Sequence, residues 1–212
     1  MGAGPTSSLV ALLAAGCRPA FDPAPYQVLR EPVIHPLPEV RVIEVEATGE
    51  SSAEAAGKAI GLLYRTWYGL DVDHGAPVAP RARWSLGAEA GAASARGRFA
   101  LPVPDGVQVL TDSPGAGGLV PRLATWTYGE TAEILHEGSY ASEGPTIARL
   151  QRTIAARGCE IAGEHEEEYL VGPGMFFRGD PDRYLTIIRY PVRCTPAPGG
   201  SPAGEPGGAT AG

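Results

Sequence analysis

The chain has 212 residues, with 17 lysines and arginines against 24 aspartates and glutamates, which gives a net charge of −7. This balance excludes a nucleic-acid-binding protein of the basic-patch type, because few cations remain to neutralise a phosphate backbone. The length suits one domain, and an apolar share of 43% is enough for an ordinary core. Glycine and proline make up about a quarter of the chain and concentrate in residues 195–212, which we expect to form a disordered tail.

The N-terminal segment has the pattern of a secretory leader. The apolar run over residues 9–15 is too short to span a bilayer, but it has the length of a signal-peptide core. The following Ala-Ala-Gly-Cys resembles the lipobox of bacterial lipoproteins. It predicts a signal peptide over residues 1–17, lipidation of Cys17, a tether over residues 18–37 and a location at the cell envelope. The alternative is a disordered leader, or a start codon placed too early, on a cytoplasmic protein.

Two sets of elements then follow in the same order. Alternating and helical apolar spacing predict a strand, a helix and two strands over 39–47, 52–67, 78–86 and 96–103. After a connection, the second set is a strand, a helix and two strands over 125–136, 142–157, 161–171 and 184–193. The chain is therefore predicted to form one α+β domain over residues 38–194, built from two strand–helix–strand–strand halves.

Cys159 and Cys194 are predicted to form a disulfide. If the last two strands form an antiparallel hairpin in which Glu167 faces Thr186, the same register places the two cysteines opposite each other. Two small buried side chains are the alternative. Neither cysteine belongs to a CxxC pair or has a histidine at zinc-finger spacing, so no metal site is predicted.

An ordered set of motifs resembles the GyrI-like family of small-molecule-binding domains, the AraC-type effector-binding domains. The second half carries it most closely, with HEGSY (136–140), the helix with Leu150 and Ile154, Gly158, the Glu-x-Tyr-Leu of 167–170 and TIIRYPV (186–192). EVEATG (44–49), LLYRTW (62–67), PRARW (80–84) and FALPVP (99–104) match the first half more loosely.

The resemblance implies antiparallel sheets that form a concave cleft with two helices packed behind it. It also implies a ligand-binding site for a small hydrophobic or cationic molecule, with a buried glutamate as countercharge and aromatic rings as walls. The matching glutamate is Glu167, and alternation sends Glu166 and Glu168 to the opposite side, towards the helices. Either neighbour would replace it if the register shifted by one. The candidate aromatic residues are Trp84, Tyr140, Tyr169 and Tyr184, the last two opposite each other in the assumed register.

The leading functional hypothesis is a stand-alone binding module that senses or sequesters such a molecule. The resemblance also leaves open a hydrolase that opens strained electrophilic rings, with Glu167 as base. A gyrase-modulating interaction and a haem site with His35, His74, His136 or His165 as axial ligand are weaker alternatives. The sequence has no GxSxG, Walker or HExxH motif, so no catalytic residue and no cofactor are assigned from sequence.

Overall fold

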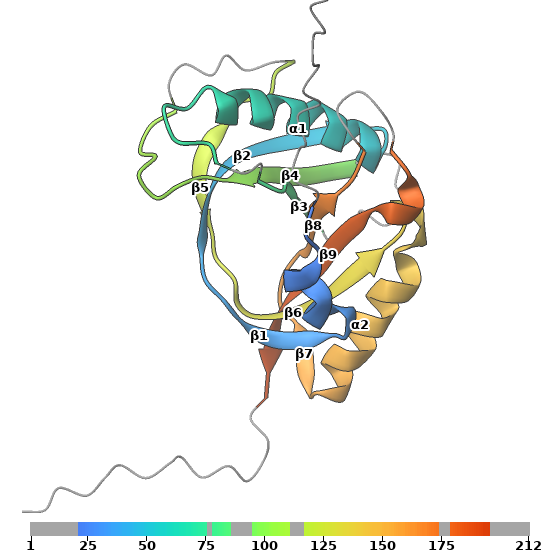
Figure 1. Ribbon diagram of the computed structural model, residues 1–212. Coiled ribbons are helices and arrows are strands. Elements are labelled where there is room, and N and C mark those ends of the chain that lie inside the picture. The colour runs from blue at the N-terminus through green and yellow to red at the C-terminus, as the bar shows by residue number, and fades with distance from the viewer. Residues whose placement is uncertain (1–20, 76–77, 86–94, 111–116, 174–178, 196–212) are drawn as a thin grey trace, which may run out of the picture.

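The computed structural model describes residues 21–75, 78–85, 95–110, 117–173 and 179–195 (Figure 1). The leader with Cys17 and residues 196–212 of the expected tail lie outside the described residues. The helices are η1 (Ala24–Arg30), α1 (Ser52–Tyr68), η2 (Tyr140–Ser142), α2 (Gly144–Ala156) and η3 (Pro181–Arg183). The strands are β1 (Val33–Leu37), β2 (Val40–Gly49), β3 (Arg81–Trp84), β4 (Ala95–Pro102), β5 (Arg122–Trp126), β6 (Gly129–Glu137), β7 (Cys159–Ile161), β8 (His165–Val171) and β9 (Leu185–Cys194).

The strands form one antiparallel sheet in the order β1-β6-β9-β8-β3-β4-β2-β5, and β7 pairs with the end of β9. The β3–β8 pair joins the two halves, β2–α1–β3–β4 and β6–α2–β7/β8–β9. The sheet curls strongly, as Figure 1 shows, and the predicted α+β class with its two halves is confirmed.

Both long helices pack on one face of the sheet, called here the helix face. Helix α1 covers β2 and β4, where Leu63 packs in one core cluster with Val45 and Phe99. Helix α2 covers β6 and β7, and its Leu150 packs with Ile188 of β9 in a second cluster. The predicted helices therefore form where their apolar spacing supplies a stripe for this face.

The opposite face, called here the inner face, closes on itself. The Arg83 guanidinium of β3 stacks 4.2 Å from the ring of Trp126, although β4 and β2 separate β3 from β5 in the sheet. Such a contact requires the sheet to curl around this face. Helix η1 also covers part of it, because Leu29 is buried there against Leu135 and Ile187.

The expected tether is largely part of the fold. From Ala24 onwards its residues form η1 and β1, and β1 pairs with β6 at the edge of the sheet. Burial of Leu29 supplies the physical reason, since a segment with an anchored apolar side chain does not behave as a free linker. Pro36 is compatible with this strand because an edge strand needs hydrogen bonds on one side only.

The hairpin register differs from the predicted one by two residues. Glu167 lies opposite Ile188, and Thr186 lies opposite Tyr169. The predicted register holds only at β7, where Cys159 lies opposite Cys194. The three residues that connect β7 to β8 produce this change of register. Because the register changes by two residues, an even number, each side chain stays on the face predicted for it.

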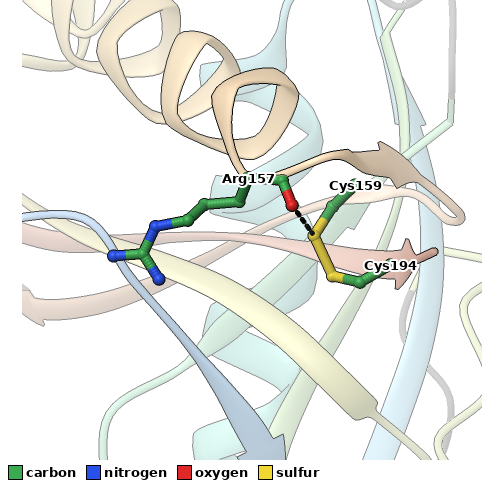
Figure 2. Close-up of a disulfide and its surroundings, with 3 residues drawn as sticks. All are labelled: Arg157, Cys159 and Cys194. Carbon is green, nitrogen blue, oxygen red and sulfur yellow. Dashed lines mark hydrogen bonds between the residues drawn. A yellow bond between two sulfur atoms is a disulfide. The ribbon is translucent and has the colours of Figure 1, made fainter. Parts of the chain in front are cut away.

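Cys159 and Cys194 are joined by a disulfide at the open end of this hairpin (Figure 2). The bond closes a loop with a sequence separation of 35 residues, which stabilises a fold by roughly 2–4 kcal/mol. The sulfur of Cys159 lies 3.7 Å from the carbonyl oxygen of Arg157, just after α2. The disulfide therefore fixes the end of β9 next to the end of α2.

No helix in the described part of the chain is long and apolar enough to cross a membrane.

A network of buried ion pairs crosses the inner face. Arg189 of β9 contacts Glu133 at 2.5 Å, Glu168 at 2.6 Å and Glu166 at 3.2 Å. Two arginines of β3 complete the network: Arg83 lies 2.7 Å from Glu166, and Arg81 lies 3.3 Å from Glu168. The network links β6, β9, β8 and β3, and therefore the two halves of the domain.

Replacing Arg189 by methionine tests the importance of this network. The substitution Arg189→Met leaves three carboxylates without their shared partner, and removal of one member of a buried ion pair costs about 3–5 kcal/mol. Urea unfolding should show a loss of that size. The matched control is Arg193→Met, which removes an exposed arginine from the same strand and should change the unfolding free energy by less than about 0.5 kcal/mol. Equal stability of the two variants would contradict the role of the network.

Candidate functional site

Glu167 lies on the helix face, between the clusters that belong to α1 and α2. Its neighbours across the strands are Ala82, which packs in the α1 cluster, and Ile188, which packs in the α2 cluster. Residues directly opposite in antiparallel strands share a face. The expectation that Glu166 and Glu168 point towards the helices is therefore wrong: both lie on the inner face, where arginines bind them.

The Glu167 carboxylate is held by two hydrogen bonds from its own strand. Its oxygens lie 2.8 Å from Nε2 of His165 and 2.6 Å from the hydroxyl of Tyr169, which donates to it. Burial, followed by the charge of Glu167, raises the pKa of Tyr169 well above its usual value, so this hydroxyl keeps its proton. The other ring nitrogen of His165 lies 2.9 Å from the hydroxyl of Tyr190. The side chain of Glu167 is 12% exposed, so it is reachable but shielded.

Three tyrosine rings gather beside this carboxylate. The ring centroid of Tyr140, which begins η2, lies 5.5 Å from that of Tyr169 and 5.3 Å from that of Tyr184. Tyr184 therefore joins the group through its contact with Tyr140. The predicted register placed Tyr184 opposite Tyr169, but Thr186 occupies that position. A Cβ at Gly172 would come within 2.8 Å of the Tyr140 hydroxyl, so glycine is needed there for this ring position.

Trp84 belongs to a different environment. Its ring packs edge-on against Phe99 at 5.2 Å in the α1 cluster, and its strand neighbour is His165. Among the described residues no ring contact joins Trp84 to the three tyrosines. The structure therefore brings together four of the five sequence candidates and packs the partly buried Trp84 against the α1 cluster.

Sequence reasoning missed a second carboxyl, Glu143. This residue precedes the first turn of α2 and is only 7% exposed, and its side chain makes no hydrogen bond to the helix end. Its Oε1 is buried without a hydrogen-bond partner in the described part of the chain. Burial, and next the charge of Glu167, raises the pKa of Glu143 to about 9. No motif marks this residue, because its burial depends on the docking of α2 and η2 on the sheet.

A cavity of about 330 Å³ borders Tyr169 at the end of the β3–β8 pair. Its surface is of mixed polarity, and Glu168 of the inner face is part of it; the lining residues are Phe21, Tyr26, Tyr64, Val78, Ala79, Pro80, Pro102, Glu168, Tyr169 and Leu170. The volume is at the lower end of the range for small-molecule pockets. Within the described residues, no three His, Cys, Asp or Glu side chains gather closely enough to hold a metal ion.

The comparisons with known proteins show likeness in fold. No family model and no curated protein matches the chain. A hydrolase from Listeria innocua has a TM-score of 0.62 at 19% identity, over 77% of this chain and 92% of that one. The EcmrR C-terminal domain has a TM-score of 0.53 at 15% identity, over 78% of this chain and 98% of that one. EcmrR in its complex with DNA has a TM-score of 0.58 at 14% identity, over 79% of this chain and 59% of that one. The chain therefore shares the fold of these proteins.

The raised pKa of Glu143 predicts a pH-dependent stability. The folded state binds the proton of Glu143 more tightly than the unfolded chain does, because the pKa is about 9 in the folded state and near 4.5 in the unfolded chain. The contribution of this proton to the free energy of unfolding is therefore complete below about pH 4.5 and is lost as the pH rises to about 9. The variant Glu143→Gln keeps a neutral group throughout. Urea unfolding should show less than about 1 kcal/mol between the proteins near pH 5, and a variant more stable by a few kcal/mol near pH 9.

The control for this prediction is Glu160→Gln, which removes an exposed carboxylate from β7. Its stability difference from the wild type should not change with pH over the same interval. A Glu143→Gln variant that behaved in the same way would mean that Glu143 is ionised in the folded protein.

Proposed function

We propose that the protein binds a small apolar cation on the helix face, with Glu167 as its countercharge. The observation that carries this proposal is a shielded carboxylate beside three tyrosine rings. Among the described residues, no lysine or arginine forms a salt bridge with Glu167. A cation placed there would gain the charge interaction and contact with the ring faces of Tyr140, Tyr169 or Tyr184.

Two further observations support this function. The motif residues that resemble the GyrI-like effector-binding domains surround the site, since HEGSY runs from the end of β6 into η2 and contains Tyr140. The fold is also that of the EcmrR C-terminal domain.

Binding should depend on the carboxylate of Glu167. We expect the monocation N-methyl-phenylpyridinium to bind the wild type, and Glu167→Gln to weaken binding roughly 10- to 100-fold, because a desolvated ion pair is lost. Isothermal titration calorimetry at neutral pH measures the effect. The exposed Glu160→Gln variant, with the same change in charge, serves as the control and should bind like the wild type. Unchanged binding by Glu167→Gln would reject this site.

A hydrolase is the second candidate function. It is favoured by the two neighbouring carboxyl groups. Glu167 could act as base and take a proton from an attacking water molecule, while Glu143, whose pKa burial raises to about 9, donates its proton to the ring oxygen as the strained ring opens. The fold is also that of the Listeria innocua hydrolase. A ring-opened product from an aryl epoxide, absent with Glu167→Gln, would favour catalysis; binding without turnover would favour the module.

The proposal extends to location. A disulfide between Cys159 and Cys194 is typical of proteins in oxidising compartments, as expected of an envelope lipoprotein anchored through Cys17. The intact mass of the protein from the membrane fraction of its native host tests this. A chain that starts at Cys17 and carries acyl groups is expected, whereas an unprocessed chain in the soluble fraction would contradict the anchor.

A further inference from the structure

Glu143 carries a buried carboxyl group, while its backbone carbonyl accepts a hydrogen bond from the N–H of Ile147 at the start of α2. The side chain makes no hydrogen bond to the end of α2, and its Oε1 has no partner in the described part of the chain. A buried polar atom without a partner is costly, and native folds leave such atoms mainly where another molecule completes them. Glu143 is also close enough to Glu167 for the two charges to interact. The unsatisfied atom therefore belongs to the ligand site.

The basic groups near this pair of glutamates are histidines, and Nε2 of His165 lies 2.8 Å from Oε1 of Glu167. The groups around Glu143 come from several elements. Those that share its site come from η2, from β8 and from Tyr184, which precedes β9, and His136 of β6 is hydrogen-bonded to Thr146 in the first turn of α2. The titratable groups of this surrounding are Tyr140, His165, Glu167, Tyr169, Tyr184 and His136. Among the described residues, neither glutamate has an arginine or lysine partner. The nearby arginines on β3 and β9, namely Arg81, Arg83 and Arg189, pair instead with carboxylates on the inner face.

We propose that Glu143 and Glu167 form a two-carboxyl site for a ligand with two positive charges, and that the second charge displaces the proton held by Glu143. This inference rests on the proposed function, since it concerns the same site. Burial, and next the charge of Glu167, raises the pKa of Glu143 to about 9, so Glu143 holds a proton at neutral pH and leaves Glu167 to supply the negative charge of the site. A monocation neutralises that charge. A dication needs the second carboxylate as well, so the proton leaves to solvent.

Two probes of almost equal shape separate these cases. N-methyl-phenylpyridinium and methyl viologen both consist of two linked six-membered rings, with one and two charges. Calorimetry in buffers with different ionisation enthalpies counts the protons released. For methyl viologen we expect about one proton released near neutral pH, and an affinity that rises about tenfold per pH unit below the pKa of Glu143. For the monocation we expect no release.

The variant Glu143→Gln is the direct test. It cannot release the proton, so the ratio of the two affinities should fall towards one and methyl viologen should bind without a pH dependence. Glu160→Gln, an exposed control, should keep both the ratio and the proton release. Methyl viologen binding without proton release in the wild type, or an unaltered ratio in Glu143→Gln, would overturn the inference. Monocation binding that depends on Glu167 would then still stand, whereas failure of both probes to bind would reject the proposed function itself.

Discussion

The site depends on how strand β8 distributes its three consecutive glutamates between the two faces of the sheet. Glu166 and Glu168 point to the inner face, where Arg189 contacts both of them at the centre of a buried network. Because side chains alternate along a strand, this network forces Glu167 to the helix face. Any register that turned Glu167 inwards would send the other two carboxylates, without their arginines, into the space between the helices. The ion pairs that join the halves of the domain thereby also place the candidate ligand-binding carboxylate.

The same arrangement divides the buried carboxylates of the sheet into two groups, one on each face. The inner-face carboxylates are matched by arginines and have a structural role. The helix-face carboxylates, Glu143 and Glu167, are shielded by tyrosine rings and by the docking of η2 and α2, and within the described residues no arginine or lysine matches them. An excess of negative charge in a partly desolvated aromatic setting favours a cationic ligand. A bound cation would supply the positive charge that no arginine or lysine of the described residues provides to these carboxylates.

The sequence predicted the local structure well and the long-range placement less well. Apolar periodicity predicted both long helices, and alternation correctly grouped Glu167 with His165 and Tyr169. It could not tell which face the helices cover, because the partners of Glu166 and Glu168 come from β3 and β9 and their pairing is a tertiary event. The two-residue change of register arises in the short segment between β7 and β8, which has no sequence signal. Glu143 was missed for a similar reason: its burial comes from packing, whereas a glutamate before a helix usually indicates a solvated end.

The most direct test of this account is the position of a bound cation. A crystal structure with N-methyl-phenylpyridinium should show the ligand on the helix face, with its charged ring within contact distance of Glu167 and against the ring of Tyr140. The inner face, with Trp126 and the arginine network, should be unchanged. A ligand bound on the inner face, or one that contacts neither Glu167 nor Tyr140, would contradict the assignment of the site.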